Sequence, residues 1–198
     1  MRMGKFTFSY RMLQRSAVVF LLCSGCGPGL YGFSKYYVPS DAEEPLDKQA
    51  REYPYGTVAA KPSEFKGQLI AWFGIVESVT KTEDGRFLVR LSHNKHLDRH
   101  LCENETDSSC RVTVNFRSSG GFSVLLDLLP EDTLPSLNRI QAGTLIRVFG
   151  RVRCHDDGKA EMQCEYDDRE GILLDGVYYR QWPARYYVTT RAMSTMHR

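Results

Sequence analysis

The sequence predicts a mainly β chain that folds as a five-stranded Greek-key barrel, with one short helix between the third and fourth strands. Three observations support this prediction. Runs of alternating apolar and polar residues recur, a glycine-containing pattern occurs twice, and Asp-Gly pairs follow or separate such runs. Alternation with a period of two is typical of half-buried strands, and Asp-Gly is typical of tight hairpin turns.

The repeated pattern predicts the first and fourth strands. Residues 67–76 and 143–152 both read Gly-x-Leu-Ile-x-x-Phe-Gly-x-Val. Each is followed by an acidic-Asp-Gly-basic sequence, at 83–86 and 156–159. A glycine inside a strand often marks a bulge or a sharp bend in a barrel. We therefore expect two similar β-hairpins, each bent at its glycine.

The remaining elements follow from the same kind of pattern. Residues 86–92 and 111–117 alternate between apolar and polar side chains and are the expected second and third strands. The apolar run 121–130 ends in proline and predicts the short helix. Asp175-Gly176, between two short apolar runs, predicts a turn in an aromatic C-terminal hairpin arm. Strand, strand, strand, helix, strand, strand is the order of an OB-fold; a small open β-sandwich is the alternative.

The first 25 residues have the features of an export signal. Basic residues precede an apolar run that is too short to span a bilayer, and small residues follow it. The sequence Leu-Cys-Ser-Gly-Cys that ends at Cys26 resembles the lipobox of bacterial lipoproteins. That resemblance implies cleavage before Cys26 and acylation of its thiol, for example with palmitate. An ordinary secretory signal or an uncleaved anchor is the alternative.

Four segments are expected on this basis. They are a lipoprotein signal peptide at 1–25, a lipidated N-terminus and flexible tether at 26–56, an OB-like barrel domain at 57–190 and a loose tail at 191–198. Glycine and proline punctuate the expected tether, and no long periodic stretch survives between them.

The charge balance argues against nucleic acid as a partner. The formal net charge is +2, but the signal segment contains four basic residues, and its removal leaves 22 basic and 24 acidic residues, a net charge of −2. Nucleic-acid binding depends on an excess of lysine and arginine facing phosphates. The expected partners are therefore a membrane, through the lipid anchor, and a protein of the cell envelope.

Four cysteines remain after the signal and the lipid attachment site are set aside. An exported chain meets an oxidising compartment, so an even number of cysteines predicts disulfides. Four cysteines allow three connectivities, and we favour Cys102–Cys110 and Cys154–Cys164 because each pair flanks one polar loop. A zinc site is the alternative, although neither spacing matches the close pairs typical of such sites.

Cys26, the first-strand segment 69–76 and the fourth-strand segment 145–152 together resemble the bacterial OB-fold lipoproteins of the Slp (starvation-inducible outer-membrane) type. The resemblance covers roughly residues 57–182. It implies an outer-membrane lipoprotein whose domain faces the periplasm and has no enzymatic activity. Gly27 agrees with this location, because an aspartate after the lipidated cysteine is the usual inner-membrane retention signal in that system.

The sequence contains none of the motifs of hydrolases, zinc proteases, phosphate-binding loops or EF-hands. We therefore expect no enzyme, no cofactor apart from the N-terminal lipid, and no resident metal ion. One dense cluster stands out, formed by His93, His96, Asp98 and His100. It is interpreted either as a metal-binding or pH-sensing site, with a response near pH 6, or as an exposed loop.

A first candidate surface is the face on which OB-folds bind oligonucleotides or glycans, formed by the second and third strands. In the predicted OB-fold, the candidate ligand face consists of Arg90, Arg111, Asn115 and Arg117. The aromatic residues on these strands are expected to point into the barrel, and stacking on bases requires exposed rings. The sequence therefore supports oligonucleotide binding only weakly.

A second candidate surface is the aromatic C-terminal segment. Its candidate interface residues are Tyr178, Tyr179, Trp182, Tyr186 and Tyr187. Tyrosine and tryptophan are enriched at protein interfaces, and they can also stack on glycans. The alternative is that this segment folds back and covers the outward-facing apolar residues of the first and fourth strands, which are Leu69, Phe73, Leu145 and Phe149.

The sequence thus predicts a lipid-anchored, periplasm-facing OB-fold module with a structural or protein-interaction role in the cell envelope. A domain that binds glycans or oligonucleotides, or a metal- or pH-sensing lipoprotein, is the alternative.

Overall fold

A computed structural model describes residues 33–102, 110–136, 139–155, 163–164, 166–167 and 171–191. The described strands are β1 (Phe33–Tyr36), β2 (Leu69–Lys81), β3 (Phe87–His96), β4 (Arg99–Cys102), β5 (Val112–Leu126), β6 (Leu145–Val152), β7 (Cys154–His155), β8 (Gln163–Cys164), β9 (Tyr166–Asp167), β10 (Gly171–Trp182) and β11 (Tyr187–Thr189). The described helices are α2 (Glu44–Asp47), α3 (Tyr55–Ala60) and α4 (Pro130–Thr133), with 3-10 turns η1 (Pro62–Phe65) and η2 (Ala184–Tyr186).

The predicted signal, Cys26 and the tail from 192 lie outside the described residues. No described helix has the length and apolar character needed to cross a membrane.

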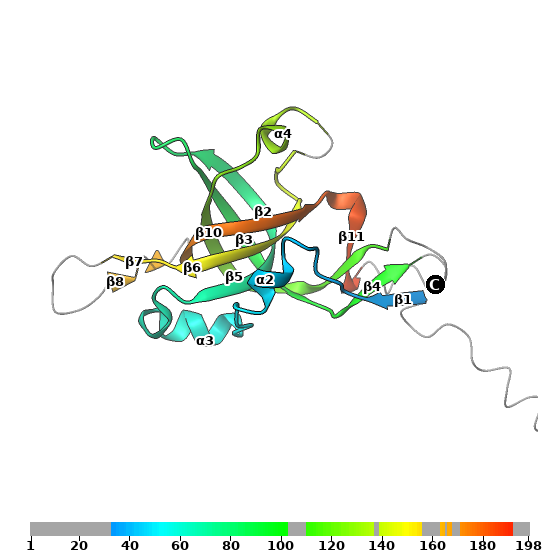
Figure 1. Cartoon of the computed structure of the whole chain (residues 1–198), viewed down its shortest axis with the longest axis horizontal. Coiled ribbons are helices and arrows are strands. Elements are labelled where there is room, and N and C mark those ends of the chain that lie inside the picture. The colour runs from blue at the N-terminus through cyan, green and yellow to red at the C-terminus, as the bar shows by residue number, and fades with distance from the viewer. Residues whose placement is uncertain are drawn as a thin grey trace, which may run out of the picture.

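Five strands close into a barrel (Figure 1). They are hydrogen-bonded in the order β5-β3-β2-β6-β10, and a parallel pairing of β10 with β5 closes the ring. The other neighbours in the ring are antiparallel. In chain order, α4 lies between β5 and β6, the third and fourth strands of the barrel. This arrangement confirms the predicted mainly β, OB-like fold class.

The hydrophobic core fills the barrel and is closed at one end by the segment that precedes β2. Tyr55 and Val58 of α3 and Phe65 of η1 are buried against the residues that the strands direct inward. The strand residues of this core include Ile70, Trp72, Leu91, Phe122, Val124, Ile146, Val148 and Leu174. The core therefore uses the apolar positions of both copies of the repeated pattern.

The repeated glycines allow neighbouring strands to approach closely. A Cβ atom on Gly74 would lie 2.9 Å from the Cβ of Leu91, and one on Gly150 would lie 2.9 Å from the Cβ of Leu174. A side chain at either position would force strands of the barrel apart.

The three Asp-Gly pairs have different outcomes. Asp84-Gly85 forms the β2–β3 turn, where Gly85 has a φ of 90°, and this prediction is confirmed. The second pair lies outside the described residues, although β7 and β8, which flank it, are antiparallel. The prediction of a turn at Asp175-Gly176 is wrong, because both residues lie inside β10. Gly176 is needed there because a Cβ would come within 2.3 Å of Leu126.

The predicted position of the short helix is also wrong. Residues 121–126 are the second half of β5 and pair with both β3 and β10. A short apolar run does not distinguish a doubly covered strand from a helix by periodicity alone. The helix is α4, and Pro130 begins it instead of ending the run, as proline does in the first turn of many helices.

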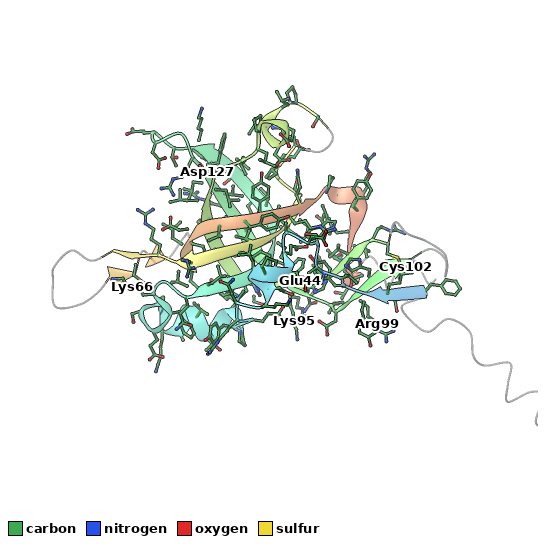
Figure 2. The ribbon with its side chains drawn as sticks, viewed as in Figure 1. Glu44, Lys66, Lys95, Arg99, Cys102 and Asp127 are labelled. Atoms are coloured by element: carbon green, nitrogen blue, oxygen red, sulfur yellow. A yellow bond between two sulfur atoms is a disulfide. The ribbon has the colours of Figure 1, made fainter. Side chains whose placement is uncertain are left out.

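The first half of β5 leaves the barrel and builds an extension with β1, β4 and β11 (Figure 1). A disulfide joins Cys102 and Cys110 there, as predicted; Figure 2 labels Cys102 and Arg99 on this part. The register of β7 with β8 sets Cys154 opposite Cys164. Cys154 is disulfide-bonded, and Cys164 as its partner remains a prediction.

Residues 33–56, expected as most of a flexible tether, lie against the folded body in the structure. β1 pairs with β4, and Leu46 and Ala50 pack on Leu69 and Phe149 of the barrel's outer face. The cover expected from the C-terminal segment at these two positions thus comes from this N-terminal segment together with Tyr178. Phe73 and Leu145 are covered by the C-terminal Trp182 and Tyr187 together with Tyr37, in line with the packing alternative.

Candidate functional site

The structure does not bring the predicted ligand face together. Arg90 lies on β3 in the barrel, opposite Ser123 of β5. Arg111 directly precedes β5, and Asn115 and Arg117 lie in the first half of that long strand, which belongs to the extension. The third strand of the barrel is therefore formed by residues further along the chain than the sequence pattern indicated.

The histidines lie on strands instead of in a loop. His93 and His96 belong to β3, and His100 belongs to β4. His93 is only 8% exposed and contacts the rings of Tyr55 and Trp72. Burial lowers the pKa of both His93 and His96 to about 4. These imidazoles are therefore neutral at pH 6, which argues against the expected response near that pH.

A cleft of about 410 Å³ lies beside these histidines, and we call it the histidine cleft. The cleft lies between residues 52–56 and the strands β2 and β3. Lys95, labelled in Figure 2, is one of its lining residues. Within the described part of the chain, Nδ1 of His93 and Nε2 of His96 are buried without a hydrogen-bond partner. The described residues contain no group of three side chains able to hold a metal ion.

Four of the five predicted interface residues are engaged inside the chain. Tyr178 packs on Phe149, and Trp182 stacks on Phe73 at 5.8 Å. Tyr179 donates a hydrogen bond to Asp132, and Tyr187 donates one to the carbonyl of Gly143 at 2.7 Å.

Tyr186, at the end of η2, is the exception among the five. Its side chain is 40% exposed, and the guanidinium of Arg185 lies 4.7 Å from the centre of its ring. The structure thus leaves Tyr186 exposed, whereas Trp182 is buried and the other three predicted interface residues are half-buried.

A cavity of about 470 Å³ lies between α4 and the end of β10, and we call it the C-terminal cavity. It is lined by Glu131, Asp132, Ser136, Arg180, Gln181, Trp182, Pro183 and Tyr186. Two predicted interface residues therefore meet in one hollow with several charged and polar groups that the sequence did not single out.

Asp132 is the central polar group of the C-terminal cavity. It is 6% exposed, and its two carboxylate oxygens accept hydrogen bonds from the Tyr179 hydroxyl and the Gln181 amide. Burial and the neighbouring Asp132 raise the pKa of Tyr179, so its hydroxyl stays a donor. The amide oxygen of Gln181 is buried and has no hydrogen-bond partner among the described residues.

A buried carboxylate lies behind the cavity and fastens the N-terminal segment to the barrel. Glu43, 0% exposed, accepts hydrogen bonds from Ser40, Tyr37 and Arg180, and Arg147 of β6 contacts it at 3.5 Å. Burial alone would raise the pKa of Glu43, but the hydrogen bonds from Ser40, Tyr37 and Arg180 outweigh it and lower that pKa. We call Tyr37, Glu43, Arg147 and Arg180 the Glu43 cluster.

Sequence reasoning missed Glu43 and Asp132. Ser40-x-x-Glu43 matches the spacing of a helix capping box, and the Ser40 backbone amide donates to Glu43 at 2.8 Å. That signal identifies a helix start but not a partner on a strand 104 residues away. Asp132 follows the predicted helix and belongs to no sequence motif.

Comparisons with known proteins leave the family open. No family model matches the chain, and no curated protein matches it. Among solved structures, the chain is similar to a small single-stranded DNA-binding protein from Streptomyces coelicolor, with 16% sequence identity and a TM-score of 0.35. The match covers 62% of this chain and 98% of that one. At this level the likeness carries no argument about function.

Proposed function

We propose that this chain is a lipid-anchored, periplasm-facing OB-fold module of the outer membrane that binds a partner protein at the C-terminal cavity and has no enzymatic activity. The observation that carries the binding site is the meeting of exposed Tyr186 with Trp182 and buried Asp132 around that cavity. Aromatic side chains beside a partly desolvated pocket are the usual anchors of protein interfaces.

The lipobox-like sequence and the resemblance to Slp-type lipoproteins support the anchoring part of the proposal. Cys26 precedes β1 by seven residues, so the chain between them spans at most about 25 Å. The Glu43 cluster and the β1–β4 pairing hold the segment that follows. A lipid on Cys26 would therefore keep the extension close to the membrane surface.

Mass spectrometry and fractionation test the anchor. We expect a mature N-terminus at an acylated Cys26, and a Cys26→Ser variant that leaves the membrane fraction. An unmodified Cys26 in membranes of the native host would contradict this part.

Photo-crosslinking from position 186 in intact envelopes tests the binding part. Position 177 is the matched control, because Val177 is also an exposed apolar residue but does not line the cavity. We expect one protein to be crosslinked from 186 and not from 177. Recovery of no protein from 186, or of the same proteins from both positions, would refute binding at this cavity.

A further inference from the structure

Hydrogen-bond acceptors without a cationic partner dominate the C-terminal cavity. Among the described residues, the carboxylate of Asp132 has only neutral donors, the Tyr179 hydroxyl and the Gln181 amide. A carboxylate offers about four lone-pair positions, so two accepted hydrogen bonds leave capacity for more. Glu131 adds a second, exposed carboxylate to the lining.

The amide of Gln181 points to the same deficit of donors. Its nitrogen is committed to Asp132, whereas its oxygen is buried with no hydrogen-bond partner within the described residues. A buried acceptor without a donor costs about 1–3 kcal/mol. A guest that brings several N–H groups would recover this cost and extend the hydrogen bonds to Asp132.

Arg180 also lines the cavity, but its charge is already compensated. Its Nη1 donates to Glu43 at 2.8 Å, and its guanidinium carbon lies 5.0 Å from the centre of the Trp182 ring. Since buried Glu43 compensates Arg180 and does not itself line the cavity, the cavity retains the uncompensated charge of Asp132 and Glu131.

The aromatic wall suits a cation as well. Trp182 and Tyr186 line the cavity, and the rings of both already lie close to a guanidinium, from Arg180 and Arg185 respectively. A cation over an aromatic face is attracted by the ring quadrupole, most strongly over tryptophan. Carboxylates together with such rings select a positive, planar or compact head group.

We infer that the C-terminal cavity receives a guanidinium or ammonium group, presented as an arginine or lysine side chain on the partner protein. This inference rests on the proposed function, whose docking site it deepens. The charge of the guest pairs with Asp132 and Glu131, its N–H groups reach the Gln181 oxygen, and its apolar stem lies along the exposed ring of Tyr186.

Matched small probes test the inference on the full mature protein in detergent. N-acetyl-arginine amide is compared with N-acetyl-citrulline amide, which keeps the shape and loses the charge. Binding is followed by tryptophan fluorescence, and Trp182→Phe shows whether the signal comes from the cavity or from Trp72. We expect at least about tenfold tighter binding of the arginine probe, since charge-assisted hydrogen bonds contribute about 1.5–3 kcal/mol.

Two variants assign the binding to these carboxylates. Asp132→Asn should weaken the arginine probe about tenfold, and Glu131→Gln, on an exposed side chain that does not threaten folding, should weaken it a few-fold. Asp84→Asn, at the distant β2–β3 turn, should change nothing. Equal affinity for both probes, or full affinity in the Glu131→Gln and Asp132→Asn variants, would overturn the inference.

The probe titration and the crosslinking experiment can fail independently, so the inference about the guest and the proposed function are tested separately. A protein crosslinked from position 186 together with no preference for arginine would overturn the cationic guest and leave the docking site standing. A clear preference for arginine without any crosslinked protein would support the chemistry of the cavity and refute the partner.

Discussion

The C-terminal cavity and the histidine cleft have similar volumes, about 470 and 410 Å³, but they hold their polar groups in opposite ways. In the first, a buried carboxylate is hydrogen-bonded, and a second carboxylate lies at the surface beside it. In the second, buried imidazoles lack partners and are kept neutral. Both hollows contain a buried polar atom without a hydrogen-bond partner among the described residues, so the charge of the buried group, and not its hydrogen bonding, distinguishes a site prepared for a guest from a part of the core.

The largest effect is expected where the Glu43 cluster supports the C-terminal cavity. Glu43→Gln leaves the guanidinium of Arg147, 3% exposed, without its buried counter-charge. Removing one partner of a buried ion pair typically costs about 3–5 kcal/mol. Arg147 keeps its second ion pair, with Asp47, so we expect a loss at the lower end of this range, about 3 kcal/mol. Urea denaturation measures this loss.

Glu44→Gln is the control for that variant. Glu44 is adjacent in sequence and pairs with Lys48 at the surface, so its loss should change the free energy of unfolding by about 0.5 kcal/mol or less. Similar losses in both variants would show that the buried Glu43 contributes no more to stability than a surface ion pair.

The next effect is expected in the histidine cleft, as a dependence of stability on pH that reaches a comparable size only near pH 4 and is close to zero at pH 7. The folded pKa of His93 is about 4, below the usual 6.5, because burial disfavours its charged form. Between pH 6.5 and 4 the unfolded chain therefore binds more protons than the folded chain, and the stability falls as the pH is lowered. For His93 the loss approaches about 3 kcal/mol at pH 4.

Unfolding by urea at several pH values checks this expectation against a His93→Phe variant. The lowered pKa values of His96 and Glu43 act in the same direction and remain in both proteins, so the difference between the two curves isolates His93. Parallel curves between pH 7 and 4, or a sharp transition near pH 6 that depends on His93, would contradict the neutral, core-like state of this residue.

The smallest effect concerns the hydrogen bond that Tyr179 donates to Asp132, a lining residue of the C-terminal cavity. Tyr179→Phe removes the hydroxyl that donates to Asp132 and accepts from the backbone amide of Leu129. We expect a loss of about 1–2 kcal/mol in the free energy of unfolding. The hydroxyl of Tyr178 makes no hydrogen bond to the described residues, so Tyr178→Phe should change stability by less than about 0.5 kcal/mol. Equal losses in the two variants would contradict the role of the Tyr179 hydroxyl.

Local patterns predicted the barrel well because they report backbone geometry. The repeated Gly-x-Leu-Ile pattern located β2 and β6, and Asp84-Gly85 located the turn after β2. The same kind of pattern failed at Asp175-Gly176, because close packing on Leu126 and a turn require the same residue type. A dipeptide does not record which of the two constraints applies.

The candidate site was less predictable because long-range contacts build it. Aromatic content identified Trp182 and Tyr186, but their exposure depends on where α4 and η2 lie. Glu43 meets Arg147 across 104 positions of the chain, and Asp132 meets Tyr179 across 47. Hydrophobic periodicity does not encode such pairs, so the sequence pattern gives no sign that these groups meet in the fold.

The central claim is that the C-terminal cavity, and not the histidine cleft, is the docking site for a partner protein. Crosslinking from both hollows within one experiment tests this claim most directly. A photoreactive residue replaces Tyr186 at the C-terminal cavity in one variant and exposed Lys95 at the histidine cleft in the other. In intact envelopes we predict that one protein is crosslinked from position 186, that free arginine amide competes with it, and that position 95 yields none. The same protein captured from position 95 alone would contradict the assignment of the C-terminal cavity as the docking site.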